Sequence, residues 1–309
     1  MASETAVTAI EEEIDYEGLG DNVPLHINMI AGALAGISEH ALMFPVDVIR
    51  TRMQILSASP AATYTGVTQA LSRISSVEGA RALWKGVNSV ILGAGPAHAV
   101  YFGTYEMVKE ATGGNASGHH FASTAFAGAS ATIASDAFMN PFDVIKQRMQ
   151  MHGSSYTSVM SCASQVYKQE GLRAFYVSYP TTLAMTVPFT AVQFSVYEYA
   201  KKVLNPKEDY SPLTHMTAGG LAGAVAAAVT TPLDVAKTLL QTRGSSTDPA
   251  IRNASGMAEA FRIITQKEGA KGFTRGMSAR IATHIPANAL CWLSYEGFRF
   301  FLNKRDKGL

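Results

Sequence analysis

Long, weakly polar segments alternate with charged ones along this chain of 309 residues. Three of them, at 27–44, 122–140 and 216–232, contain at most one acid each and no Lys or Arg. Each meets or approaches the roughly 18 residues that a membrane-spanning helix needs. They are rich in Gly, Ala, Ser and Thr rather than Leu, which is typical of helices that pack closely on one another. The pattern predicts an all-α membrane protein, although its mean hydropathy is close to zero.

Each weakly polar segment ends in a copy of one ten-residue pattern. The copies begin at Pro45, Pro141 and Pro232, and each has an acid two residues later and a base three residues after that acid. Three copies at so regular a period indicate an internal triplication. A proline inside a helix removes one backbone hydrogen bond and clashes with the preceding turn, so we expect a helix kink at each copy.

This triplicate pattern resembles the signature of the mitochondrial carrier family, Pro-x-acid-x-x-base at the foot of every odd-numbered transmembrane helix, and the match covers about residues 25–303. The resemblance implies the mitochondrial carrier fold: six transmembrane helices in three pseudo-symmetric repeats, with short amphipathic helices on the matrix side. We expect an acidic disordered tail at 1–23 and carrier repeats 1, 2 and 3 at 24–113, 118–206 and 211–304, which form one transmembrane domain.

Charge is unevenly distributed, although the formal net charge of +1 gives no support for a nucleic-acid partner. The loops after the motif prolines, at 45–86, 141–178 and 232–276, hold twice as many Lys and Arg as Asp and Glu. Such an excess marks the side from which translocation is disfavoured, so the three loops share one face. The resemblance implies that this face is the matrix and that both termini of the protein, a monomer in the mitochondrial inner membrane, point to the intermembrane space. The acidic N-terminus is not a transit peptide, so we expect internal targeting.

The even-numbered helices share two further features. Each follows a Glu-Gly pair, and the resemblance implies that cardiolipin phosphate binds there to the unpaired amides of a helix start. Each ends in Tyr-Glu-x-x-base, which places an acid and a base on one helix face. Three copies in register predict a ring of charges, the cytoplasmic gate. Its members are Glu106, Lys109, Glu198, Lys201, Glu296 and Arg299.

The acids and bases of the ten-residue pattern predict a second ring, the matrix gate, because charges deep in a membrane protein normally pair and line a pathway. Closing one ring while the other opens gives alternating access to a site near the midplane. The glutamine that ends each copy resembles the glutamine brace of the family. We expect the pairs Asp47–Lys146, Asp143–Lys237 and Asp234–Arg50, braced by Gln54, Gln150 and Gln241.

No nucleophile–base set, Gly-rich phosphate loop or Cys/His zinc spacing occurs, so we expect neither an enzyme nor a prosthetic group. The cargo must then be read from side chains that face the cavity. His40 lies two helical turns before Asp47, roughly 10 Å above the gate, and the same offset in repeat 2 gives Asp136. Alignment of the even helices on their prolines adds Met185, His284, His98 and Asn288.

Imidazole, carboxylate and thioether groups are ligands of first-row divalent metals. A carrier of nucleotides or dicarboxylates would need inward Lys or Arg, and Arg280 is the one candidate near this level. The segments 39–45, 93–99 and 139–143 also resemble the mitoferrin subgroup, which brings iron into mitochondria. That resemblance implies an iron relay of three histidines: His40, His98 and His215. His215 is about 100° off the inward stripe by helix geometry.

We therefore expect a carrier that imports ferrous iron, and other divalent metals, as its transported substrate. The ion would bind His98 and then His40 with Asp136, and leave through the opened matrix gate. Two alternatives remain: a carrier of a small organic cation or metabolite, with histidines as hydrogen-bonding groups, and a non-transporting membrane scaffold. Three intact gates argue against the scaffold.

Overall fold

The computed structural model describes residues 25–56, 64, 66–112, 121–206, 212–284, 286–287 and 290. The chain forms two compact units, one of residues 1–42 and 287–309 and the other of residues 43–286. Every regular element within the described residues is a helix, in agreement with the predicted all-α fold.

Repeats 1 and 2 each contribute a long helix, a short one and a second long one, and the described part of repeat 3 contributes a long helix, short helices and a final helical segment. In repeat 1, α2 (Leu25–Gln54) starts where the sequence predicted and continues through Pro45 without a break. The remaining bounds follow in chain order. They are α3 (Val67–Val77), η2 (Ala80–Trp84), α4 (Val87–Ala111), α5 (Phe121–Gln150), α6 (Val159–Glu170), η3 (Leu172–Phe175), α7 (Tyr179–Leu204), α8 (Pro212–Thr242), η4 (Arg243–Ser245), α9 (Pro249–Arg252), α10 (Met257–Glu268), η5 (Gly269–Thr274) and a helical segment at 277–284.

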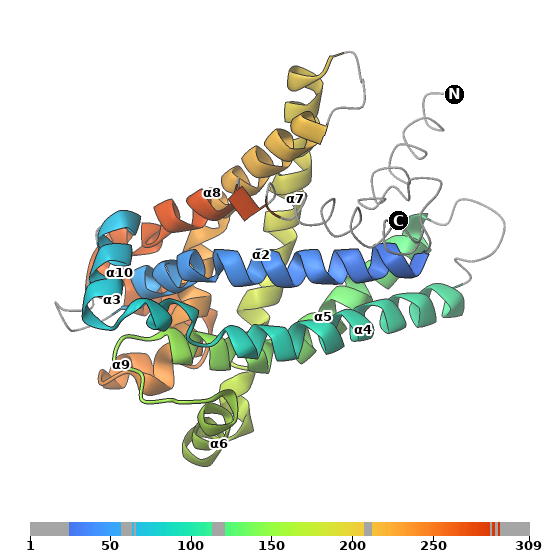
Figure 1. Ribbon diagram of the computed structural model, residues 1–309. Coiled ribbons are helices and arrows are strands. Elements are labelled where there is room, and N and C mark those ends of the chain that lie inside the picture. The colour runs from blue at the N-terminus through green and yellow to red at the C-terminus, as the bar shows by residue number, and fades with distance from the viewer. Residues whose placement is uncertain are drawn as a thin grey trace, which may run out of the picture. The chain divides into compact units, whose positions relative to one another are not determined.

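Neighbouring repeats are joined by pairs of long helices. Figure 1 shows α4 lying along α5, and α7 lying along α8. Hydroxyl groups bridge the first pair, because Ser89 Oγ donates to the Phe142 carbonyl at 2.7 Å and Ser135 Oγ donates to the Ala97 carbonyl at 3.1 Å. Small side chains let these backbones come close enough for such contacts, as is typical of membrane helices.

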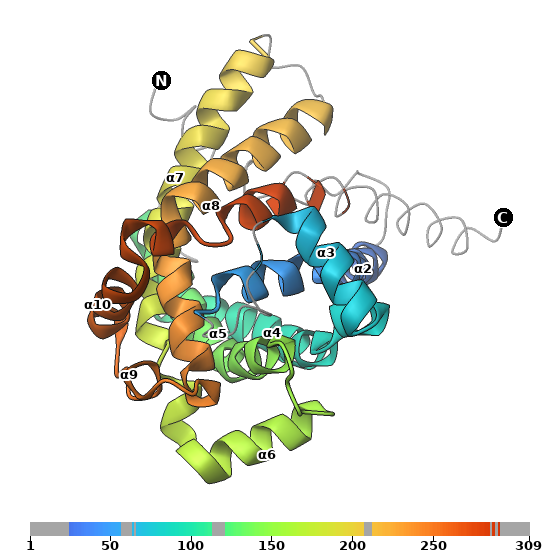
Figure 2. The ribbon, with the colours of Figure 1, turned by 90° about the vertical axis from the view of Figure 1, so that its left-hand side faces the viewer.

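Three similar hydrophobic clusters lie where the short helices pack on the ends of the long ones, one cluster per repeat. In the view of Figure 2, α3, α6 and α10 lie around the ends of the long helices. Each short helix buries a small side chain at one shared register position: Ala70, Cys162 and Ala260. Burial raises the pKa of the Cys162 thiol to about 11, so this side chain behaves as a small apolar group.

One helix in the described part of the chain, Thr214–Ser245, is long and apolar enough to cross a membrane by hydropathy. The other long helices carry more hydroxyl groups. Several of these bond to the carbonyl four residues back, as Thr132 does to Gly128 at 2.9 Å and Thr186 does to Thr182 at 3.0 Å. Such bonds satisfy a hydroxyl within its own helix, so a low hydropathy score is compatible with a spanning helix.

Candidate functional site

The acids and bases of the three motif copies form a closed ring of ion pairs, which we call the motif ring. Each pair joins one odd-numbered long helix to the next, and all three have the partners expected from the sequence. The distances are 2.8 Å for Lys146 Nζ–Asp47 Oδ2, 3.3 Å for Lys237 Nζ–Asp143 Oδ2 and 2.6 Å for Arg50 Nη2–Asp234 Oδ2.

The Asp234 corner of this ring differs from the other two. The Asp234 side chain is only 4% exposed, whereas those of Asp47 and Asp143 are 25% and 27% exposed. Its Oδ2 accepts a hydrogen bond from Gln54 Nε2 at 2.6 Å and lies 3.5 Å from Nη1 of Arg280. The buried carboxylate of Asp234 therefore contacts two guanidinium groups and one amide.

The three glutamines beyond the ring do not behave alike. Gln54 reaches the ring carboxylate of Asp234, and its own Oε1 accepts from Thr238 at 3.1 Å. Gln150 Oε1 instead accepts from Thr51 Oγ1 at 2.7 Å. Both polar side-chain atoms of Gln241 are buried without a hydrogen-bond partner among the described residues. Within the described part of the chain, a contact between a glutamine and a ring carboxylate is thus seen for Gln54.

Two arginines next to the motif ring, Arg52 and Arg148, link the helices that form it. Arg52 Nε donates to the Gln150 carbonyl at 2.8 Å, and its Nη2 donates to Glu78 Oε2, also at 2.8 Å. Arg148 makes the same contacts one repeat later: Nε with the Gln241 carbonyl at 3.0 Å, and Nη2 with a glutamate oxygen, Glu170 Oε2, at 2.9 Å. We call each of these arginine–glutamate pairs a clamp.

Repeat 3 builds its clamp from a different position. Leu239 occupies the register position of Arg52 and Arg148, and it is buried in the hydrophobic cluster of repeat 3. Arg275, which follows η5, instead pairs with Glu268 and donates from Nε to the Met53 carbonyl at 2.9 Å. The three clamps therefore close a cycle from repeat 1 to 2, from 2 to 3 and from 3 back to 1.

The sequence contained the signals for the clamps, although their pairing was not predicted. Arg52 and Arg148 recur in register, and so do the three Glu-Gly pairs, which were interpreted as starts of the even helices. The role of Arg275 had no such signal, because the register points to Leu239. Only the folded chain brings this guanidinium to the end of α2.

The first clamp also includes a histidine. His152 Nδ1 lies 2.7 Å from Glu78 Oε1, and the imidazole is 34% exposed. Burial of Glu78 would raise its pKa, but the hydrogen bonds from Arg52 and His152 outweigh burial and lower the pKa below the ordinary value. Glu78 is therefore held as a carboxylate.

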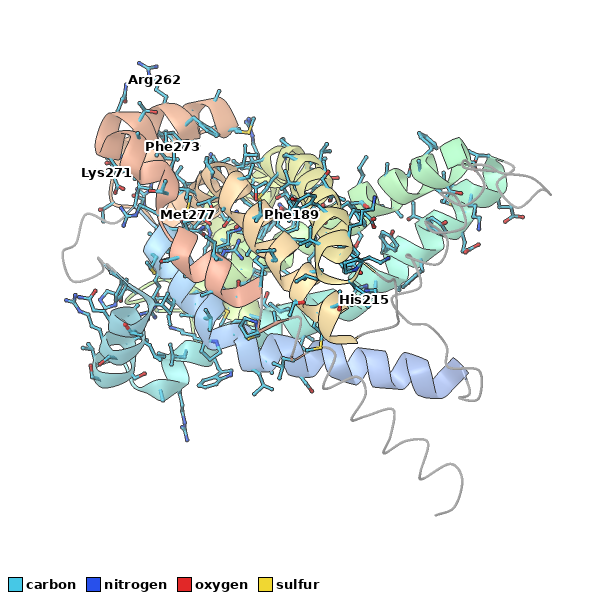
Figure 3. The ribbon with its side chains drawn as sticks, turned by 90° about the horizontal axis from the view of Figure 1, so that it is seen from above. Phe189, His215, Arg262, Lys271, Phe273 and Met277 are labelled. Carbon is cyan, nitrogen blue, oxygen red and sulfur yellow. The ribbon has the colours of Figure 1, made fainter. Side chains whose placement is uncertain are left out.

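The expected cargo residues are spread over several helices. His98 is exposed on α4, and Asp136 is partly buried on α5. Met185 Sδ lies 3.8 Å from Nη2 of Arg280. His215, near the start of α8 (Figure 3), has its Nδ1 2.6 Å from the hydroxyl of Tyr197 on α7.

His284 packs against a neighbouring helix. A Cβ atom added to Gly223 of α8 would lie 2.8 Å from His284 Nδ1, so the glycine makes room for the imidazole. The ring centroids of His284 and Phe189 are 6.0 Å apart. Among the described residues, no three His, Cys, Asp or Glu side chains gather closely enough to hold a metal ion. The side chain of His40, and all of Asn288, lie outside the described residues.

Four of the residues expected to form the second ring lie near the opposite ends of the long helices. Glu106 is exposed, and the Lys109 ammonium lies 5.7 Å from the ring centroid of Tyr105. Glu198 and Lys201 stand near the end of α7. The third acid and base, Glu296 and Arg299, lie outside the described residues.

Comparison with known proteins accounts for this threefold plan. The sequence model described as "Mitochondrial carrier protein" matches residues 21–116, 117–208 and 208–306. The chain is 50% identical over 304 residues to the mitochondrial RNA-splicing protein MRS4 of Saccharomyces cerevisiae, covering 97% of this chain and 99% of the yeast protein. It is 45% identical over 297 residues to human mitoferrin-1, covering 94% and 88% of the two chains.

Human mitoferrin-2 is also 45% identical, over 301 residues that cover 95% of this chain and 82% of that protein. The resemblance to the mitoferrin subgroup, which the segments around residues 40, 96 and 141 suggested, is thereby confirmed. Three consecutive matches to one sequence model, together with the ring of ion pairs, give the six-helix carrier fold and a place in the mitochondrial inner membrane. The chain belongs to the mitochondrial carrier family.

Proposed function

We propose that this chain imports ferrous iron into the mitochondrial matrix by alternating access, and that it acts as a transporter rather than an enzyme. The observation that carries the proposal is the motif ring, in which three ion pairs link the three odd-numbered helices. The similarity to mitoferrins and the imidazole and carboxylate groups of the expected cavity support iron as the cargo.

Opening the motif ring requires that its ion pairs separate. The pairs of Asp47 and Asp143 are partly exposed, and an exposed pair stabilises by only about 0–1 kcal/mol. Breaking a buried pair costs more, about 3–5 kcal/mol when one partner is removed. We propose that the corners of Asp47 and Asp143 open readily and that the buried Asp234 corner accounts for most of the free energy needed to open the ring.

The proposed route uses few ligands. Iron would meet His98, then His40 with Asp136, and leave through the ring. A closed four-ligand site would trap the ion, so weak and separated ligands suit conduction. The matrix-negative potential assists entry by about 2.3 kcal/mol per charge per 100 mV, or about 4.6 kcal/mol for a divalent ion.

Orientation and lipid binding complete the proposal. We place both termini in the intermembrane space and the basic loops in the matrix, in line with the positive-inside rule. Cardiolipin phosphate would bind the starts of the even helices, as at α4, where Gly86 provides no side-chain cap. Amides left free in this way suit an anionic headgroup. We propose that the carrier works as a monomer.

Iron uptake into proteoliposomes tests this function. The wild-type carrier should take up Fe²⁺ faster than protein-free vesicles, and a potential negative inside should raise the rate. His40→Ala and His98→Ala should each lower uptake at least tenfold. The control His119→Ala removes a histidine between repeats 1 and 2, outside the predicted relay, and should leave uptake unchanged.

A second candidate is suggested by Arg280. This residue is 3% exposed, its guanidinium shares Asp234 with Arg50, and its Nη1 atom has no hydrogen bond among the described residues. A metabolite with an anionic group could bind there, which fits a metabolite carrier. In that case both histidine variants would retain iron-independent metabolite exchange, and Arg280→Gln would abolish it.

A further inference from the structure

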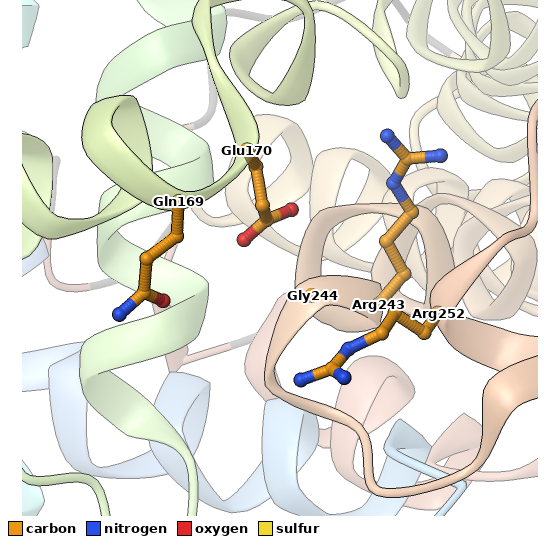
Figure 4. Close-up of a pocket in the computed structure, with 5 residues that line it drawn as sticks. All are labelled: Gln169, Glu170, Arg243, Gly244 and Arg252. Carbon is orange, nitrogen blue, oxygen red and sulfur yellow. The ribbon is translucent and has the colours of Figure 1, made fainter.

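A pocket of about 590 Å³ lies between repeats 2 and 3, beside the second clamp. Figure 4 shows Gln169 and Glu170 entering it from the end of α6, and Arg243, Gly244 and Arg252 lining the opposite side. A Cβ atom added to Gly244 would lie 2.0 Å from Glu170 Oε1, so the carboxylate rests directly against the η4 backbone. The pocket is thus bounded by two repeats that touch.

Positive charge exceeds negative charge around this pocket. Glu170 is already paired with Arg148, which leaves the guanidinium groups of Arg243 and Arg252 without a matching carboxylate in the lining. The positive charges of Arg148 and Arg173 also act on Arg243, and the negative charges of Glu170 and Glu259 offset part of them. An anion in the pocket would relieve this crowding of positive charge.

Arg243 also retains hydrogen-bonding capacity. Its Nη1 donates to the Ala254 carbonyl, but its Nε is buried and has no hydrogen-bond partner within the described ranges. A buried N–H group of a charged side chain without a partner costs free energy, and such groups in folded proteins call for an explanation. Arg252 is exposed and able to turn toward a ligand.

The equivalent place between repeats 1 and 2 lacks this surplus. His152 stands where Arg243 stands in the next repeat, and its ring contacts Glu78 directly at 2.7 Å. Lys85, the other base nearby, donates to the Ser154 carbonyl. Two guanidinium groups that face a pocket are therefore a feature of the junction between repeats 2 and 3, not of the threefold plan.

We propose that this pocket binds a phosphate group, held by Arg243 and Arg252. Two guanidinium groups match the charge and geometry of a phosphate dianion. A phosphate that keeps one proton can donate that O–H to Glu170, whereas sulfate and carboxylate ligands carry no such proton at neutral pH. The Gln169 amide can donate to a further oxygen.

Bound phosphate would tie repeat 2 to repeat 3 next to the motif ring. If the motif ring opens during transport, phosphate bound between the two repeats would slow that opening. Phosphate on the matrix side would therefore lower the rate of iron uptake. That consequence rests on the proposed function. Binding itself does not, and it is measured below without transport.

Thermal unfolding of the purified full-length carrier in detergent tests the site. Inorganic phosphate at constant ionic strength should raise the midpoint temperature, and sulfate should raise it less. Arg252→Gln and Arg243→Gln should each weaken the apparent phosphate affinity about tenfold. Arg262→Gln removes an exposed charge on α10, outside the pocket, and should respond as the wild type does (Figure 3).

A second arm distinguishes a soluble phosphate from a lipid headgroup. The same variants are titrated with cardiolipin in place of inorganic phosphate. The phosphodiester of cardiolipin carries no proton to donate to Glu170, so we expect inorganic phosphate to stabilise more; stabilisation that depends on Arg252 in either arm supports the site and identifies the source of the phosphate. The proposal is overturned if neither ligand stabilises the wild type, or if the stabilisation is the same in Arg252→Gln and Arg243→Gln as in the wild type.

Discussion

The Asp234 corner of the motif ring and the corners of Asp47 and Asp143 derive from copies of one motif, yet they are built differently. Asp234 is almost fully buried and contacts Arg50, Gln54 and Arg280, whereas the other two acids are about a quarter exposed and pair with lysines. Internal repetition therefore fixes the pairing but not its strength. We expect the ring to have one strong and two weak corners.

The largest predicted effect concerns these corners. Asp234→Asn leaves two guanidinium groups facing a neutral amide in a buried site, and it should destabilise the purified carrier by about 3–5 kcal/mol. Asp143→Asn, at a partly exposed corner, should cost about 0–1 kcal/mol. Denaturant or thermal unfolding measures both, and equal losses would contradict the asymmetry.

The next prediction concerns the third clamp. Arg275→Leu removes a charged hydrogen bond to Glu268 and one to the Met53 carbonyl, so it should cost about 2 kcal/mol of stability. Adding Leu239→Arg to that variant supplies a guanidinium at the register position used in repeats 1 and 2. We expect the double variant to recover the thermal midpoint. A double variant less stable than Arg275→Leu would contradict the idea that an arginine at position 239 can replace Arg275 in the clamp.

Much of this architecture could be predicted from the sequence. The copies of Pro-x-acid-x-x-base, with threefold pseudo-symmetry, place each acid beside bases of the adjacent repeats, and the three observed pairs are those that were expected. The start of α2 at Leu25 agrees with the predicted start of repeat 1 at residue 24, and the short helix α3 agrees with the amphipathic helices that the resemblance implied.

Other features depend on contacts that spacing does not encode. Arg275 reaches the end of α2 from the far side of η5, and Gly223 accommodates His284 from another helix. The three motif glutamines show the same limit. Gln54, Gln150 and Gln241 occupy equivalent positions in the repeats but differ in their hydrogen bonds. Repetition predicts which residues correspond, and packing decides what each one touches.

A smaller effect is expected from pH at the first clamp. The pKa of Glu78 is lowered in the folded protein, so its stabilising contribution is present above the ordinary value of 4.5 and is lost as the pH falls through the folded-state pKa. Thermal midpoints measured from about pH 6 down to about pH 3 should fall in the wild type more than in Glu78→Gln. The same series in His152→Ala should show a smaller slope difference, because the hydrogen bond from His152 also lowers the pKa of Glu78.

The smallest effect is expected at Cys162. Its register partners are Ala70 and Ala260, so Cys162→Ala should change the unfolding free energy by less than about 1 kcal/mol. Because the buried thiol has a pKa of about 11, a maleimide reagent at pH 7 should not label it in the folded carrier. Fast labelling would show that the cluster of repeat 2 opens more readily than its packing indicates.

The central claim is that iron crosses a ring whose corners close as ion pairs between adjacent repeats. The most direct test is iron uptake into proteoliposomes that contain variants with exchanged charges at the weak Asp143–Lys237 corner. This corner is partly exposed, so the variants should still fold. Asp143→Lys and Lys237→Asp should each abolish most uptake, and the double exchange should restore much of it. Uptake that persists in both single variants, or a double variant no better than either, would contradict the account.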